Sequence, residues 1–176
     1  MTLTTHEPMV TFTLPGVDGK TYGPESFAET PALAVIFWCN HCPYVRAWED
    51  RVIALAQEYA DRGVQFLLIN SNDPAKYPDD SFEQMTVRAR EKGYPFPYLF
   101  DESQAVARQY GATRTPEIFL FDRDRTLRYH GATDDSVDDP AAVRVRFFRD
   151  AIEAVLGGRA PEVAETPPRG CTIKWR

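Results

Sequence analysis

The sequence has few cysteines, more acidic than basic residues and no long apolar run. Three cysteines among 176 residues are too few, and odd in number, for a disulfide-stapled scaffold. With 26 acidic against 20 basic residues and a formal net charge of −6, the chain lacks the basic patch that nucleic-acid binding requires. No run approaches the ~18 apolar residues of a membrane span, and residues 1–10 lack the apolar core of a secretory signal. We therefore expect a cytoplasmic protein, with no nucleic-acid or membrane partner, whose cysteines are present for their reactivity.

The composition suits one globular domain, because 43% of the residues are hydrophobic and the chain is long enough for a full core. Apolar runs typical of strands alternate with helical patterns. Strands are predicted at 11–14, 31–38, 64–69, 117–121 and 126–129. Helices are predicted at 24–29, 43–62, 81–92, 103–110 and 139–156. This order indicates an α/β fold with parallel pairing and one later antiparallel pair, in a domain at 1–158 followed by a proline-rich, irregular tail at 159–176 that packs on the same domain.

The segment Cys39-Asn40-His41-Cys42 carries the clearest chemical signal. It follows the apolar run 32–38 and precedes a helical pattern. Two thiols at this spacing can close a small disulfide ring, and a helix N-terminus lowers the pKa of a neighbouring thiol from its usual ~8.5. The same spacing occurs in zinc sites, which usually have a second pair of ligands, and the rest of the chain offers none. Redox chemistry is therefore favoured, with a partial metal site or inert cysteines as the alternatives; no metal or cofactor is predicted.

The position of Pro43 decides which thiol lies at the helix start. Proline fits the first helical position because its missing N–H would have no partner there, so Cys42 becomes the N-cap. If Cys39 were the cap, Pro43 would fall where its N–H should bond, and Cys42, preceding a proline, would be pushed out of the helical region. The sequence therefore predicts a helix that begins at Pro43, with Cys42 beside its free N–H groups and Cys39 outside it.

Several segments together resemble the thioredoxin-like superfamily, in particular the branch of alkyl hydroperoxide reductase and thiol-specific antioxidant proteins. The segments are FTLPGVDGKTY, AVIFWCNHCPYV and GATRTPEIFLFD. Two more, INSNDPAKYPDDSFEQM and the terminal GCTIKW, are similar to a bacterial subgroup called thioredoxin family proteins. The resemblance implies a thioredoxin-like fold, with a central mixed sheet flanked by helices on both faces, and an antioxidant or thiol–disulfide exchange activity.

The resemblance also implies roles for the cysteines. Cys42 falls where the thioredoxin nucleophile normally sits, Val45 takes the place of the usual second cysteine, and Cys39 is a partner upstream in the loop. Peroxiredoxins place a threonine or serine three residues before their cysteine and a proline seven before it. Here those positions hold Cys39 and Val35, so the hydroxyl that helps orient peroxide is missing and a peroxidase activity is less favoured.

Four further residues enter through the same resemblance. The Thr115–Pro116 bond is expected to be cis, with the Thr115 backbone turned towards the sulfurs, where it can pair with a substrate strand. Arg114 is either a cation near the thiolate or a solvated arginine. His41 either stabilises the neighbouring thiolate or is a surface histidine of the loop.

Cys171 lies in the tail, 13 residues beyond Gly158. An extended chain of that length reaches roughly 40 Å, so Cys171 can return to the site as a resolving thiol. The alternative, which we favour from the sequence, is a thiol that only anchors the tail.

These observations predict an enzyme, a thiol–disulfide oxidoreductase with a redox-active Cys39/Cys42 couple and Cys42 as the nucleophile. Its partners would be protein or small-molecule disulfides and an upstream thiol reductant. Two alternatives stay open: a thiol peroxidase, acting on peroxides through Cys42, and a non-enzymatic thioredoxin-like binding module.

Overall fold

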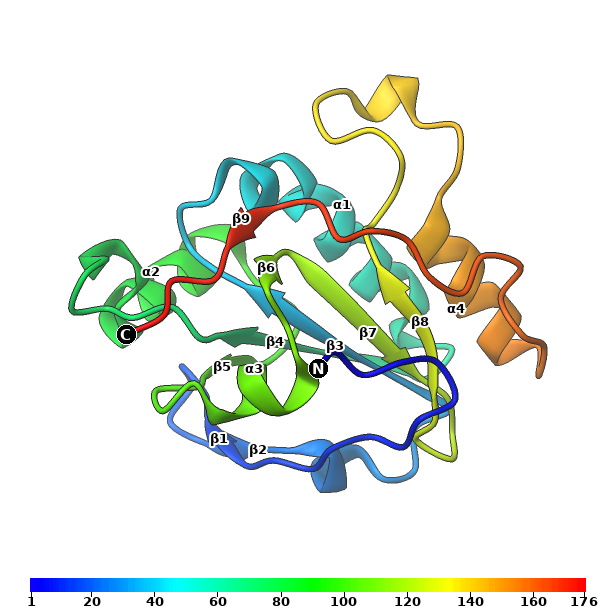
Figure 1. Ribbon diagram of the computed structural model, residues 1–176, viewed down its shortest axis with the longest axis horizontal. Coiled ribbons are helices and arrows are strands. Elements are labelled where there is room, and N and C mark those ends of the chain that lie inside the picture. Colours follow the sequence, from blue (N-terminus) through cyan, green and yellow to red (C-terminus); the bar gives the residue numbers. More distant parts are fainter.

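A five-stranded mixed sheet forms the centre of the computed structural model, which describes residues 1–176 (Figure 1). Its strand order is β5 (Tyr98–Phe100), β4 (Val64–Asn70), β3 (Ala32–Trp38), β7 (Glu117–Phe121) and β8 (Leu127–Gly131). The pairs β3–β4 and β4–β5 are parallel, whereas β3–β7 and β7–β8 are antiparallel. The predicted combination of parallel pairing with a later antiparallel pair is therefore confirmed.

Strand β3 lies in the middle of the sheet and every one of its side chains is buried. Successive side chains of a strand point to opposite faces, so Ile36 and Trp38 enter one apolar core while Val35 and Phe37 enter the other. A continuous apolar run is what a strand covered on both faces requires. This burial fixes the end of β3, and hence the start of the cysteine segment, at the edge of the sheet.

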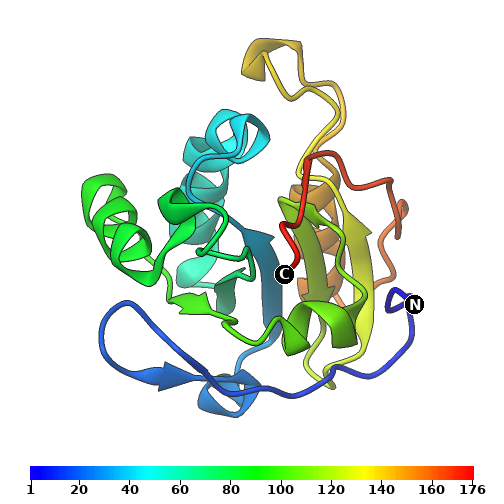
Figure 2. The same ribbon diagram turned by 60° about the vertical axis from the view of Figure 1, so that its left-hand side comes forward.

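Helices cover both faces of the sheet, as Figure 2 shows. The first core is closed by α1 (Pro43–Ala60), α2 (Phe82–Lys92) and α4 (Phe147–Leu156). The second core is closed by α3 (Ala105–Tyr110) together with the N-terminal segment that includes β1 (Leu14–Pro15), β2 (Thr21–Tyr22) and the 3₁₀ helix η1 (Pro24–Phe27). This is the predicted mixed sheet with helices on both faces. No helix has both the length and the apolar character needed to cross a membrane.

The predicted helix at 139–156 is wrong in its first half. The structure has a 3₁₀ turn, η3 (Pro140–Ala142), and α4 begins only at Phe147. Between them the backbone bonds to another loop, because Arg144 N–H donates to the Asp135 carboxylate (2.9 Å) and Asp135 N–H donates to Val145 (3.2 Å). Backbone groups used in this way are not free to continue a helix.

The tail at 159–176 is also more ordered than the predicted irregular segment. Its strand β9 (Cys171–Thr172) pairs antiparallel with β6 (Arg114–Thr115), in the register Thr115 opposite Cys171. Figure 1 shows this red segment crossing the end of the molecule where α1 begins. Ile173 is buried in the second apolar core, so the tail packs on the domain rather than extending from it.

Candidate active site

The cysteine segment links the end of β3 to the start of α1. The helix begins at Pro43 with Cys42 as its N-cap, in an extended backbone conformation (φ −64°, ψ 130°), and Cys39 lies outside the helix. The predicted register is therefore confirmed. Both cysteines are only 1% exposed, and neither forms a disulfide.

Thr115 contacts both thiols of the segment. Its side-chain oxygen lies 3.4 Å from the Cys39 sulfur, and its carbonyl oxygen lies 3.4 Å from the Cys42 sulfur, from which it accepts a hydrogen bond while that thiol is protonated. The bond from Thr115 to Pro116 is cis, as expected. The loop before β7 thus lies directly against the cysteine segment, although the two are far apart in the sequence.

The two cysteines have opposite pKa shifts. The pKa of Cys42 is lowered to about 5, first by a hydrogen bond from the Cys39 thiol and further by the Cys171 thiol and the backbone N–H of Val45. The pKa of Cys39 is raised well above its usual value, because its proton is held in the bond to Cys42, because it is buried, and because the Asp80 carboxylate is near. At neutral pH the site therefore holds a Cys42 thiolate beside a protonated Cys39.

Cys171 completes a cluster of three thiols. It lies opposite Thr115 in the β6–β9 pair and packs against the core that contains Cys39 and Cys42. Burial and a hydrogen bond to Cys42 raise its pKa to about 11. The sequence left the position of this tail cysteine open, and the structure brings it to the nucleophile.

His41 lies against a buried carboxylate. Its Nδ1 atom lies 2.8 Å from Asp80 Oδ2, and its ring stacks on Tyr77 with centroids 6.2 Å apart. Asp80 is fully buried and also accepts hydrogen bonds from the backbone N–H of Asn40 and the side chain of Asn72, each 2.8 Å long. Sequence analysis missed this residue, since an acidic pair before a helix is more often a favourable helix-start charge.

Cys39, His41 and Asp80 also test the alternative of a partial metal site. One ligand atom from each lies within 4.8 Å of the others, so these three residues could hold a metal. However, Asp80 already accepts bonds from Asn40 and Asn72. The hydrogen bond to Cys42 keeps Cys39 protonated, whereas a metal ion binds a deprotonated cysteine. Both contacts therefore compete with metal binding at these residues.

Arg114 lies against the tail rather than beside the thiolate. Its guanidinium is exposed and donates a 3.0 Å hydrogen bond to the carbonyl of Gly170. The side chain is exposed, as the solvated-arginine alternative expected, and in addition it contacts the tail.

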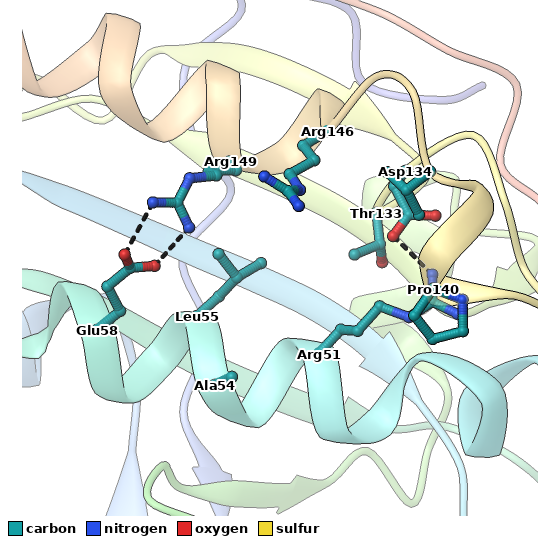
Figure 3. A pocket seen from close by; sticks show the side chains of 10 residues that line it. Arg51, Ala54, Leu55, Glu58, Thr133, Asp134, Pro140, Arg146 and Arg149 are labelled. Carbon is teal, nitrogen blue, oxygen red and sulfur yellow. Dashed lines mark hydrogen bonds and ion pairs between the residues drawn. The ribbon is translucent and has the colours of Figure 1, made fainter.

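A cavity of about 240 Å³ lies elsewhere, between α1, α4 and the loop after β8 (Figure 3). Two of its arginines pair with its two carboxylates: Arg51 with Asp134 at 2.7 Å, and Arg149 with Glu58 at 2.6 Å. No cysteine lines it, so this cavity is separate from the three thiols.

The mixed sheet, the cysteine at the cap of α1 and the threonine–proline bond against it define a thiol-based redox protein of the thioredoxin fold. The chain belongs to the Redoxin family, whose pattern matches residues 4–145. No curated protein matches the chain.

Two solved structures are similar over nearly the whole length. An uncharacterized conserved protein from Geobacillus kaustophilus shares 40% identity, with 98% of this chain and 93% of that chain covered and a TM-score of 0.93. A hypothetical protein from Sinorhizobium meliloti shares 37% identity, with 100% and 97% covered and a TM-score of 0.92. A putative thiol:disulfide interchange protein DsbE from Chlorobium tepidum is similar in fold, at 19% identity, 89% and 98% coverage and a TM-score of 0.68.

Proposed function

We propose that the protein is a thiol–disulfide oxidoreductase that cycles Cys39 and Cys42 between dithiol and disulfide. One observation carries the proposal: Cys42 is the N-cap of α1, Cys39 lies just outside the helix, and both sulfurs lie 3.4 Å from oxygens of Thr115. The neighbouring Cys39 thiol lowers the pKa of Cys42 to about 5 in this arrangement. A nucleophile and a resolving thiol in contact are what disulfide exchange requires.

The reaction proceeds by two exchanges. The Cys42 thiolate attacks one sulfur of a substrate disulfide, forms a mixed disulfide and releases the first substrate thiolate. Cys39 then attacks the Cys42 sulfur, forms the Cys39–Cys42 disulfide and releases the second substrate thiol; its own proton leaves with it. An upstream thiol reductant returns the pair to the dithiol. The substrate is reduced by two electrons and the cysteine pair is oxidised by two.

The surroundings assist each step. The backbone N–H groups at the start of α1 stabilise the attacking thiolate of Cys42. The hydrogen bond to Cys42, burial and the Asp80 carboxylate raise the pKa of Cys39, and the first of these is lost once Cys42 has reacted. Only three cysteines in the chain suit a reducing compartment, so the proposal includes a cytoplasmic protein that acts on protein or small-molecule disulfides.

The position three residues before Cys42 favours disulfide exchange over peroxide reduction. In peroxidases of the resembled branch this position holds a residue with a hydroxyl group. Here it holds Cys39, whose thiol is hydrogen-bonded to Cys42. The same preparation can test both activities: reduction of insulin disulfides with dithiothreitol as reductant, and consumption of hydrogen peroxide with the same reductant.

The decisive variants are compared in a Cys171→Ser background, where only Cys39 can resolve. Cys42→Ser should abolish insulin reduction, because a serine hydroxyl is not ionised near neutral pH. Cys39→Ser should trap Cys42 as a mixed disulfide, visible as an added mass on the protein. Consumption of peroxide without any insulin reduction would overturn the proposal in favour of a peroxidase.

A further inference from the structure

The tail occupies an edge of backbone directly beside the thiols. Strand β9 pairs with β6 through Thr115 and Cys171, and Thr115 is the residue whose carbonyl and hydroxyl contact the Cys42 and Cys39 sulfurs. The chain therefore places one of its own cysteines on the strand edge that borders the reactive pair.

A glycine makes this approach close enough. A side-chain carbon at Gly170 would lie 2.0 Å from the Thr115 carbonyl oxygen and 3.1 Å from the Pro116 nitrogen, so any larger residue would collide with backbone. Arg114 adds a contact at the same residue, because its guanidinium donates a hydrogen bond to the Gly170 carbonyl. The residue before Cys171 is thus fitted to the loop that carries Thr115.

The tail beyond Cys171 is also held by specific contacts. The backbone N–H of Lys174 donates to the Asn72 side chain, and the Lys174 carbonyl accepts from Asp73, each at 2.8 Å. Ile173 N–H donates to the Thr113 carbonyl at 2.9 Å, and its side chain is buried. The Arg108 guanidinium lies over the ring of Trp175 at 4.6 Å from its centroid. These contacts fix the position of the tail thiol.

Exposure differs between the three sulfurs. Cys39 and Cys42 are each 1% exposed, whereas Cys171 is half-buried. In this arrangement a thiol arriving from solvent meets Cys171 first. We propose that Cys171 is a third redox-active cysteine, which exchanges disulfides with the Cys39–Cys42 pair through Cys42 and carries the disulfide to the surface.

The exchange rests on the disulfide of the proposed function and needs no further oxidant. The Cys171 thiolate attacks the Cys42 sulfur of the Cys39–Cys42 disulfide. The Cys42–Cys171 bond forms, the Cys39–Cys42 bond breaks, and its electron pair leaves with Cys39, which takes up the proton that Cys171 released. An external thiol then attacks the Cys171 sulfur and frees Cys42, and a second external thiol releases the small disulfide product and restores Cys171.

The test maps disulfides after equilibration in a buffer of reduced and oxidised glutathione, by mass spectrometry of peptides under non-reducing conditions. The wild type should give both Cys39–Cys42 and Cys42–Cys171 peptides. Cys39→Ser should give Cys42–Cys171, and Cys171→Ser should give Cys39–Cys42. A wild type without any Cys42–Cys171 peptide, or a Cys39→Ser variant with Cys42 bound to glutathione and Cys171 free, would overturn the inference.

A second pair of variants tests the docking of the tail. Gly170→Ala should reduce the Cys42–Cys171 peptide at least tenfold and leave the Cys39–Cys42 peptide unchanged, because only the tail is displaced. Thr172→Ala, at an exposed position of the same strand, is the matched control and should behave as wild type. Equal yields in the two variants would count against β9 as the element that presents Cys171. Failure of the proposed function would give a different result: the Cys171→Ser variant would yield no Cys39–Cys42 peptide.

Discussion

At the scale of single residues, the chemistry of the site depends on where three protons reside. Cys42 gives up its proton readily because the thiols of Cys39 and Cys171 donate to it. The hydrogen bonds that Cys39 and Cys171 make to Cys42 raise the pKa of these two thiols, and burial raises it as well. One sulfur is therefore prepared to attack while its neighbours stay unreactive until it has done so.

The first residue-scale prediction is the pH profile of Cys42. Its alkylation by iodoacetamide should rise through about pH 5 and level off above it, because only the thiolate reacts and its pKa is lowered to about 5. A pKa depressed by folding also means that the thiolate stabilises the reduced fold above the unfolded value of ~8.5, and that this contribution is lost as the pH falls towards 5. Cys39 and Cys171 should remain unlabelled at pH 7. A Cys42 midpoint near 8.5 would contradict the assignment of the nucleophile.

The second residue-scale prediction concerns the effect of Asp80 on the pKa of Cys39. Its charge helps to raise the pKa of Cys39, so Asp80→Asn should lower that pKa, measured as the pH-dependent ¹³Cβ shift of Cys39. Asp79→Asn is the control, because the Asp79 side chain is exposed. An unchanged Cys39 titration in Asp80→Asn would mean that its hydrogen bond to Cys42 alone holds the proton.

At the scale of elements, α1 is held by charges as well as by apolar packing. Glu49, on α1, is 2% exposed and accepts hydrogen bonds from Arg88 on α2 (3.1 Å, and a second shorter one) and from Tyr94 (2.5 Å). Tyr94 in turn accepts from the indole N–H of Trp38 at the end of β3. This network joins α1 and α2 to the strand that leads into the cysteine segment.

The element-scale prediction is a loss of stability when one partner of this network is removed. Arg88→Ala leaves the buried Glu49 carboxylate without its main partner and should lower the free energy of unfolding by about 3 kcal/mol. Urea denaturation measures this free energy. The control is Arg90→Ala, at an exposed arginine of the same helix, whose free energy of unfolding should stay within about 0.5 kcal/mol of wild type. Equal losses in both variants would show that the buried pair adds nothing specific.

At the scale of the whole molecule, the tail joins the two apolar cores to the site. Cys171 packs against the core under α1, and Ile173, two residues further, enters the core on the other face of the sheet. Opening of the tail must therefore withdraw a buried isoleucine, and the energy of that burial controls how often Cys42 becomes accessible.

The whole-molecule prediction follows from this coupling. Truncation of a buried isoleucine costs roughly 2–5 kcal/mol, and about 1.4 kcal/mol corresponds to a factor of ten. Ile173→Ala should therefore raise the rate of Cys42 alkylation at pH 8 at least tenfold, while Thr172→Ala leaves it unchanged. An unaltered rate in Ile173→Ala, together with a lower overall stability, would show that Cys42 becomes accessible by a route that does not involve the tail.

The sequence by itself predicted the central strands β3, β4, β7 and β8 and the helix start at Pro43, whereas the strand predicted at 11–14 is only the two-residue β1 (Leu14–Pro15). Local rules carry these predictions, because a continuous apolar run is typical of a strand buried on both faces and a proline fits the first position of a helix. The assignment of Cys39 and Cys42 as the reactive pair stays a prediction. The Thr115–Pro116 contact was also expected, through the resemblance. The break of the predicted last helix was not, because it depends on Asp135 binding the backbone of a loop nine residues away.

Only the tertiary structure decided what surrounds Cys42. Asp80 and Cys171 belong to segments whose local sequence indicates a helix start and an irregular tail, and nothing local shows that Asp80 lies near Cys39 and Cys171 against Cys42. Their positions depend on backbone contacts between distant segments, the pairing of β6 with β9 and the bond from Asn40 N–H to Asp80. Such contacts are set by the packing of the whole chain, and so the environment that tunes the thiols could not be predicted from the motif that contains them.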